Sequence, residues 1–412
     1  MAVDSQLTGN LLPVAGVRGA AIAAGIRYPN RLDLVLFELA AGSVLSGVFT
    51  RNAFCAAPVT IARKHLDSGE GRYLLVNTGN ANAGTGKGGV SDALLCCEEV
   101  ARCASQTGNA LVSLQQVLPF STGVIGERLP LQRIVANIPR AMGQLEDNPW
   151  EAAARGIMTT DTRPKALSVR VTLPTGGQLV ITGIAKGAGM IKPNMATMLA
   201  FVFTDATIEQ PLLNRLLTDA VNQSFNRITV DGDTSTNDCC LLVATGGSGL
   251  TIKEDHPEQL AIFQKELNQV FQQLATELIR DAEGATKFVA VKVAGGANTE
   301  ECLAVAYAIA ESPLVKTALF ASDANWGRIL AAVGRAGILD LEIEKIAIQL
   351  GEVILVENGE VSASYSEQNG QAEMEKDEIT LSIDLARGSS VETVWTSDLS
   401  HDYVRINADY RS

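Results

Sequence analysis

The chain has 412 residues, of which 46% are apolar and 19% are charged, a composition typical of a globular protein with a large core. Its net charge of −13 argues against a nucleic-acid or anionic-membrane partner, because either partner selects a basic surface. The N-terminal residues lack the basic and apolar regions of a signal peptide, and no run of roughly 18 apolar residues spans a bilayer. We therefore expect a soluble cytoplasmic protein.

The cysteines do not form the pattern of a metal site. Among the seven cysteines, the adjacent pairs 96–97 and 239–240 lack C-x-x-C spacing, and the three histidines are far apart in the sequence. We interpret the cysteines as small buried apolar side chains in a reducing compartment, and we expect no bound metal.

Apolar runs and their periodicity predict the elements of the first half of the chain. In chain order these are strands over 32–37 and 73–76, a helix over 93–104, and a hairpin of 169–173 with 178–182. The Pro-Thr-Gly-Gly between the last two runs is a turn sequence. A Gly-rich stretch follows, and residues 197–203 are then predicted to form a buried strand.

The second half mixes long amphipathic helices with further strands. The predicted elements are helices over 212–221, 258–280 and 300–310, and strands over 238–244, 288–293, 346–348, 353–356 and 379–383, with a turn at 358–359. The polar stretch 366–378 is predicted to be an exposed loop. Hairpins combined with amphipathic helices indicate α/β layers built on largely antiparallel sheets.

The most informative segment is 186–198, Lys-Gly-Ala-Gly-Met-Ile-Lys-Pro-Asn-Met-Ala-Thr-Met. Its Thr197 opens a buried strand after several turn-forming residues, so its hydroxyl is placed to attack the carbonyl of Ala196. Hydrolysis of that ester would leave Thr197 as a new N-terminus, whose α-amine titrates near ~8 and can act as a general base. From residue chemistry alone, an ordinary Thr at the start of a strand remains the simpler alternative.

The same segment resembles the self-processing site of the ornithine acetyltransferase family, the glutamate N-acetyltransferases of arginine biosynthesis. Further stretches are similar to the family in the same order along the chain: 51–54, 77–82, 121–126, 158–162, 230–238, 322–328 and 407–410. The resemblance therefore extends over essentially the whole chain.

This resemblance implies a fold and a chain organisation. The fold is an α-β-β-α layered sandwich, self-cleaved between Ala196 and Thr197 into an α chain, residues 1–196, and a β chain, residues 197–412. The two chains are expected to remain one intertwined catalytic unit, and an α2β2 heterotetramer is implied as well. Cleavage would then mark a chemical boundary and not necessarily a domain boundary.

The resemblance also implies roles for particular residues. Thr197 is the nucleophile, with its α-amine as base, and Thr122 and Gly123 form the oxyanion hole. The substrate contacts are Thr160, Lys186, Thr197, Glu283, Asn407 and the terminal Ser412. From the residues alone, simpler explanations stay open: a turn at 121–123, a solvated lysine at a strand end, and a polar residue before a helix-ending glycine.

The implied activity is acetyl transfer from N2-acetyl-L-ornithine to L-glutamate, in two steps through an acetyl-Thr197 intermediate. Acetyl-CoA is expected as an additional acetyl donor, although no basic cluster in the sequence marks its site, and no bound cofactor is expected. The alternative among enzymes is an N-terminal-Thr amidohydrolase or aminopeptidase of similar fold. Outside enzymes, the alternative is an uncleaved carrier or binding protein.

Other motifs in the sequence fail when they are tested residue by residue. Residues 84–89 resemble a P-loop, but Ala81 and Gly88 occupy positions that require Gly and Ser or Thr. Gly187-Ala-Gly189 begins like a dinucleotide fingerprint, but Lys192 stands at the third glycine position. The aspartates of 231–238 lack the glycine and glutamate of a calcium loop, so we expect a hydrogen-bonded turn near the active site.

Overall fold

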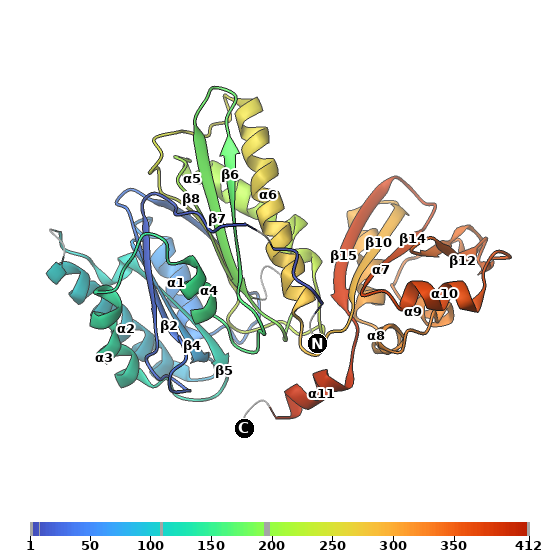
Figure 1. Ribbon diagram of the computed structural model, residues 1–412, viewed down its shortest axis with the longest axis horizontal. Coiled ribbons are helices and arrows are strands. Elements are labelled where there is room, and N and C mark those ends of the chain that lie inside the picture. The colour runs from blue at the N-terminus through green and yellow to red at the C-terminus, as the bar shows by residue number, and fades with distance from the viewer. Residues whose placement is uncertain (1–2, 8, 108–109, 193–197, 410–412) are drawn as a thin grey trace.

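The computed structural model describes residues 3–7, 9–107, 110–192 and 198–409, and its strands form three sheets. Two of these sheets lie in a larger lobe and the third in a smaller lobe beside it (Figure 1). The larger lobe ends after α6 (Pro257–Arg280), and the smaller lobe begins with β10 (Phe288–Gly296).

The first sheet has the order β1-β2-β4-β5. Its strands are β1 (Val17–Ile22), β2 (Leu34–Leu39), β4 (Tyr73–Asn80) and β5 (Val117–Val124). Alternate side chains point to opposite faces, so Leu34 and Leu36 pack against α2 (Gly86–Thr107) and α3 (Leu131–Met142). Val35 and Phe37 point to the other face, toward the second sheet.

The second sheet has the order β3-β9-β8-β7-β6. Its strands are β3 (Val44–Phe49), β9 (Cys239–Ala244), β8 (Leu199–Thr204), β7 (Gln178–Lys186) and β6 (Lys165–Thr172). Its outer face is covered by α5 (Gln210–Gln223) and α6, whose apolar stripes share a core with it. The strands on both sides of position 196 therefore hydrogen-bond within one sheet.

Aromatic side chains fill the space between the two sheets. The ring centroids of Phe120 and Phe201 are 5.1 Å apart in an edge-to-face arrangement, and Phe37 lies 5.2 Å from Phe203. The two open edges of the sandwich are closed by α1 (Ala57–Leu66), which contacts β5 and β3, and by α4 (Trp150–Gly156), which contacts β1 and β7. The predicted α-β-β-α sandwich is confirmed.

The smaller lobe holds a sheet of the order β13-β12-β11-β14-β10-β15, beneath helices that include α7 (Thr299–Ala310). The remaining strands are β11 (Ala347–Leu350), β12 (Val353–Glu357), β13 (Glu360–Val361), β14 (Glu378–Asp384) and β15 (Ser390–Ser397). The other helices are α8 (Pro313–Phe320), α9 (Trp326–Gly334), α10 (Glu367–Met374) and α11 (His401–Ala408). Among the described residues, short 3-10 helices lie at Leu114–Gln116 and Phe225–Arg227 in the larger lobe and at Ile343–Lys345 in the smaller lobe.

The prediction of an exposed loop over 366–378 is wrong, because this stretch contains α10. The Ser366 side chain accepts a hydrogen bond from the Asn369 N–H and so begins the helix. Gly370 and Met374 are buried four residues apart on one face. The other side chains of the stretch are mostly polar and exposed, so the sequence lacks the apolar periodicity that predicts a helix.

The sheets are largely antiparallel, as predicted, but each contains one parallel pair: β4 with β5, β8 with β9, and β10 with β14. The cysteines lie mainly in the core, since six are buried and Cys55 is partly so. Among the described residues, no single helix is long and apolar enough to cross a membrane, although the bent pair of α7 and α8 meets that test together.

Lys316, on α8, supplies a test of the smaller lobe. Its buried ammonium donates hydrogen bonds to Thr396 Oγ1, at 3.0 Å, and to the carbonyl of Ser397. Burial lowers the pKa of Lys316 to about 8, although Asp398, Asp231 and Glu311 partly oppose this shift. Between about pH 8 and the ordinary lysine value, the unfolded chain holds a proton that the folded chain has released.

This residue should therefore make the protein more stable as the pH rises through that window, by roughly 3 kcal/mol in total. Urea unfolding at a pH just below about 8 and at a pH just above the ordinary lysine pKa measures the free energy of unfolding. This free energy should rise between the two pH values in wild type and rise less in Lys316→Met. The exposed Lys345→Met is the matched control. Equal pH dependence in wild type and Lys316→Met would contradict this account.

Candidate functional site

A cavity of about 240 Å³ opens where strands of both sheets of the larger lobe end. Its walls include Thr122, Gly123, Thr160, Lys186, Glu283 and Asn407, all of them site residues predicted from the sequence. Ala196, Thr197 and Ser412 lie outside the described residues. The cavity thus brings together the predicted residues that the structure describes, from strand ends, loops and the final helix.

One wall is the end of β5, where Thr122 and Gly123 lie beside the parallel strand β4. Gly123 has φ +131°, and a Cβ added there would come within 2.4 Å of the carbonyl carbon of Gly79. Only glycine fits this backbone, so the tight pairing of the two strands depends on it. The Thr122 side chain and the Gly123 backbone therefore occupy fixed places at the cavity wall, whereas the sequence also allowed a turn here.

Asn237 forms hydrogen bonds with this strand end. It was not identified as a site residue from the sequence. Its amide donates hydrogen bonds to the carbonyls of Ala81, at 2.6 Å, and Ser121, at 2.9 Å. The hydroxyl of Ser121 donates to Asn77 Oδ1 at 2.5 Å. These buried bonds fix the strand that carries Thr122; the signal in the sequence was the polar run just before the buried strand β9.

Lys186 ends β7 and points its ammonium toward Thr159 Oγ1, 3.4 Å away. Burial lowers its pKa below the ordinary lysine value, although the carboxylates of Asp161 and Asp238 partly offset the effect. Asp238, also in the cavity wall, is only 3% exposed. Its Oδ2 makes no hydrogen bond to any residue that the structure describes, and burial raises its pKa well above the usual value.

The pKa values of Lys186 and Asp238 are thus displaced toward each other by the same low-dielectric surroundings. Ionisable groups with pKa values displaced by burial and by a charged neighbour are common at functional sites. From the sequence, Asp238 is predicted only to lie in a turn near the site, because burial of a carboxylate depends on tertiary packing.

Beneath the cavity lies a buried ion cluster. The Lys165 ammonium is completely buried and donates to Asp161 Oδ1 and Asp281 Oδ2, each at 2.6 Å. Asp161 also accepts hydrogen bonds from the backbone N–H of Gly187, at 2.7 Å, and Thr159, at 2.9 Å. Burial alone would raise the pKa of Asp161, but Lys165 and Lys186 more than offset this and hold it below the usual range.

Glu283 follows the end of α6 and faces the cavity with 8% of its surface exposed. Its backbone N–H donates to the carbonyl of Ala188 at 2.9 Å, and its Oε2 accepts a hydrogen bond from Asn407 Nδ2 at 2.8 Å. A Cβ at Gly189 would lie 2.4 Å from the same carboxylate oxygen, so glycine leaves room for this side chain.

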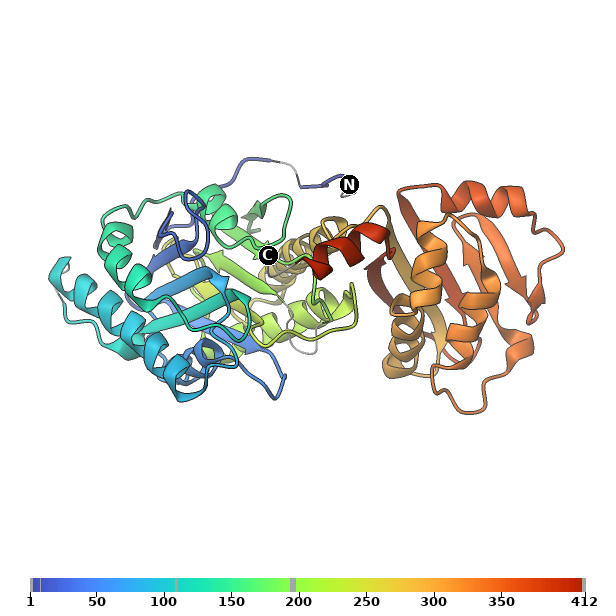
Figure 2. The same cartoon turned by 90° about the horizontal axis from the view of Figure 1, so that it is seen from below.

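Asn407 belongs to α11, which follows the smaller lobe and extends from it toward the larger lobe (Figure 2). Two side chains anchor this helix. The Ser400 hydroxyl donates to the carbonyl of Gly284 at 2.6 Å, and the Tyr403 hydroxyl donates to Asp231 Oδ2 at 3.1 Å. The final helix thus places an amide at a site built otherwise by the larger lobe.

Asp231 lies in the hydrogen-bonded turn that the sequence predicted near this site. Its carboxylate accepts hydrogen bonds from the backbone N–H of Met190, at 2.7 Å, and Ile191, at 2.9 Å. It therefore holds the Gly-rich stretch that leads toward residues 193–197. Across the part of the chain that the structure describes, no group of three or more His, Cys, Asp or Glu side chains is arranged to hold a metal ion.

The ion cluster predicts a large stability effect. Lys165→Met would leave the carboxylates of Asp161 and Asp281 buried without their cation, at a cost of about 3–5 kcal/mol in the free energy of unfolding. Lys376→Met removes a lysine of an exposed ion pair with Glu373 and should cost less than about 1 kcal/mol. Denaturant unfolding measures both, and equal losses would show that the cluster does not stabilise the site.

Comparison with known proteins identifies the family. The ArgJ family model matches residues 18–412. The arginine biosynthesis bifunctional protein ArgJ of Pseudomonas fluorescens is 52% identical over 413 residues, covering 100% of both chains. That of Psychrobacter arcticus is 53% identical over 404 residues, covering 98% of this chain and 97% of the relative.

A crystal structure of ornithine acetyltransferase complexed with ornithine, from Mycobacterium tuberculosis, shows 34% identity and a TM-score of 0.38, covering 45% of this chain and 94% of that one. On the family match and the full-length relatives, this chain belongs to the ArgJ family.

Proposed function

We propose that this protein is an acetyltransferase of arginine biosynthesis that moves the acetyl group of N2-acetyl-L-ornithine to L-glutamate. Family membership and the names of the full-length relatives support this activity. The observation that carries the proposal is the single cavity that unites Thr122, Gly123, Lys186 and Glu283, which supply the donors and charges that an acyl transfer between amino acids needs.

The proposed nucleophile is Thr197, released as an N-terminus by cleavage after Ala196. Support comes from the residues that follow it. Leu199 pairs with Lys186 on one side and Cys239 on the other, and the carbonyl of Met198 accepts a hydrogen bond from the Cys239 N–H at 2.8 Å. Residues 199–204, which follow Thr197 closely in the sequence, thus lie between the strand that ends at Lys186 and the strand that follows Asp238.

In the first step, the Thr197 oxygen forms an ester bond with the acetyl carbon, and the bond between that carbon and the ornithine nitrogen breaks. The Thr197 α-amine takes the hydroxyl proton and passes it to the departing nitrogen. In the second step, the glutamate nitrogen bonds to the acetyl carbon and the ester bond to the Thr197 oxygen breaks, while the same α-amine takes a proton from the attacking nitrogen and gives it to the threonine oxygen. Negative charge develops on the acetyl oxygen in both steps, where the Thr122 hydroxyl and the Gly123 N–H stabilise it.

Two charged residues of the cavity are proposed to bind different groups of the amino-acid substrate. Lys186 is suited to a substrate carboxylate, and Glu283, oriented by Asn407, is suited to an ammonium group. Thr160 supplies a hydroxyl to the cavity wall, and Thr197 and Ser412 complete the proposed set of contacts. A site that binds glutamate lets its amine deacylate the enzyme faster than water does.

The proposal includes acetyl-CoA as a second acetyl donor, which is consistent with the name bifunctional protein in the relatives. It also includes cleavage into an α chain, 1–196, and a β chain, 197–412, that together form one catalytic unit and assemble as an α2β2 heterotetramer. A cytoplasmic location follows from the assignment to amino-acid biosynthesis.

Thr122→Ala tests the oxyanion hole. Loss of one donor lowers the rate of comparable acyl transfers by about 100- to 1000-fold, so kcat should fall at least about tenfold. Initial rates with N-acetylornithine and glutamate measure the effect, and Thr218→Ala, on the exposed face of α5, is the matched control.

Near-normal turnover of Thr122→Ala would refute its role. The wild-type double-reciprocal plots should show parallel lines, since the acetyl group rests on the enzyme between substrates; intersecting lines would refute the two-step scheme. Release of free acetate in excess glutamate would instead support an amidohydrolase.

A further inference from the structure

A second cavity, of about 200 Å³, adjoins the first and shares part of its wall. Gly123, Val124, Thr159 and Thr160 line both cavities. The shared wall includes the glycine that the proposed mechanism assigns to the oxyanion hole. A molecule in the second cavity can therefore reach the same acyl carbon from another direction.

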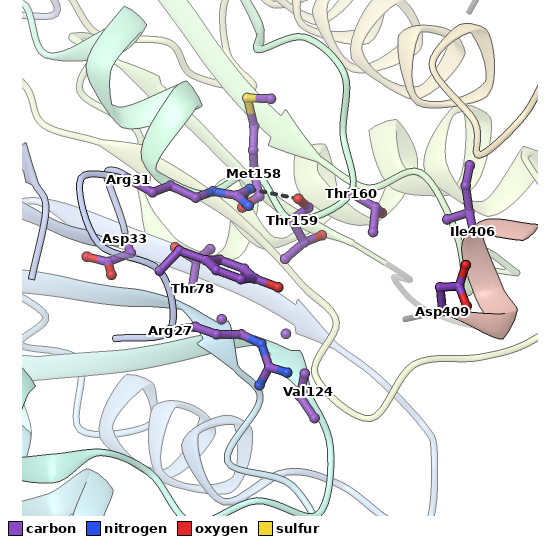
Figure 3. A pocket seen from close by; sticks show the side chains of 13 residues that line it. Arg27, Arg31, Asp33, Thr78, Val124, Met158, Thr159, Thr160, Ile406 and Asp409 are labelled. Carbon is purple, nitrogen blue, oxygen red and sulfur yellow. Dashed lines mark hydrogen bonds between the residues drawn. The ribbon is translucent and has the colours of Figure 1, made fainter. Parts of the chain in front are cut away.

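The rest of this wall combines apolar surface with hydroxyl groups. Met158 and Ile406 contribute apolar side chains, the Tyr28 ring contributes an aromatic face, and Thr78 contributes a hydroxyl. Figure 3 shows Ile406, on α11, and Asp409, which follows that helix, across the cavity from Thr159 and Thr160. The cavity thus lies between the larger lobe and the final helix.

The charged groups of the wall are largely balanced. Arg31 Nη2 donates to the carbonyls of Met158, at 2.8 Å, and Thr159, at 2.7 Å, and so supports the loop between the cavities. The Asp33 carboxylate accepts hydrogen bonds from the backbone N–H of Ala24 and Ile26, each at 2.6 Å. Such a wall suits a neutral, flexible chain with amide and methyl groups better than a compact ion.

Arg27 is a partly exposed cation in this wall. Its side chain is 22% exposed, its Nη1 lies 3.0 Å from Glu127 Oε2, and its guanidinium carbon lies 5.8 Å from the centre of the Tyr28 ring. A partly exposed guanidinium at the rim can meet a phosphate that stays outside the cavity.

We propose that the second cavity receives the pantetheine arm of an acyl thioester donor, whose thioester carbon lies at Gly123 and whose phosphates remain near Arg27. The inference rests on the proposed function, which includes acetyl-CoA as a donor. The first cavity has room for the amino acid that leaves N-acetylornithine. The leaving group of a thioester is a long chain, so it needs additional space that begins beside the oxyanion hole. Gly123 lines both cavities, and the second adds the apolar side chains of Met158 and Ile406 and the ring of Tyr28, which do not line the first.

The chemical step balances without another reactant. The Thr197 oxygen forms the ester bond to the acetyl carbon, and the bond between that carbon and sulfur breaks. The Thr197 α-amine takes the hydroxyl proton and gives it to the departing sulfur, so the arm leaves as a thiol. The acetyl-enzyme is then the same species that N-acetylornithine forms, and glutamate completes the transfer in the same way.

The test compares three acetyl donors on the same enzyme: acetyl-CoA, S-acetylpantetheine and N-acetylornithine, each with glutamate as acceptor. Met158→Trp fills the second cavity, and Ile406→Trp narrows it from α11 in case the first variant folds poorly. Either change should lower kcat/KM at least about tenfold for both thioesters and leave N-acetylornithine within about twofold. Arg27→Met should raise KM about 5-fold for acetyl-CoA but not for S-acetylpantetheine.

Arg102→Met, on the exposed face of α2, is the control and should leave all donors unchanged. Equal losses for all three donors, or no loss for the thioesters, would overturn the inference. A wild-type enzyme that uses N-acetylornithine but neither thioester would also overturn it and leave the proposed function standing. A wild-type enzyme that uses none of the donors would refute the proposed function itself.

Discussion

The geometry of the site depends on the buried pairing of Lys165 with Asp161 and Asp281. Removing three charges from water costs several kcal/mol per ion, and only close geometry with further hydrogen bonds offsets that cost. Here each carboxylate lies 2.6 Å from the ammonium, and Asp161 gains two backbone N–H donors. The cluster thereby joins the loop at Thr159, the turn at Gly187 and the end of α6, which are the supports of Thr160, Lys186 and Glu283.

Around this ion cluster, the cavity is formed by segments that are far apart in the sequence. The Thr122 wall comes from the first sheet, Lys186 and Asp238 from the second, Glu283 from the end of α6, and Asn407 from the final helix. Hydrogen bonds between elements hold several of these segments: Lys186 to Thr159, Asn407 to Glu283, and Asn237 to the end of β5. A catalytic site that must hold an oxyanion donor and two charged contacts within a few ångströms gains from such preorganisation, because no reorganisation is needed during the reaction.

Much of the fold could be predicted from the sequence, because the signals are local. The apolar stripe of α6 and the hairpin of β6 and β7 depend on periodicity and turn residues, and both appear close to their predicted positions. The boundary between the lobes could not be predicted, since no linker of unusual composition separates α6 from β10. Helix α10 was missed because it buries only two of its residues, Gly370 and Met374.

The candidate site could be predicted only in part, because some of its properties depend on which side chains are buried together. Resemblance identified the residues that line the cavity, but the charge state of Asp238 and the cluster around Lys165 arise from burial, which sequence spacing does not reveal. The second cavity likewise exists only where the loops at Arg27 and Met158 meet α11, three segments that no local pattern connects.

The central claim is that Thr197 becomes the N-terminal nucleophile of the mature protein. The most direct test is the intact mass of purified wild-type protein beside Thr197→Ala. The account predicts two fragments in wild type, residues 1–196 and 197–412, and a single chain in the variant. A wild-type chain that remains uncut after long incubation would contradict the account, because the proposed general base would then not exist.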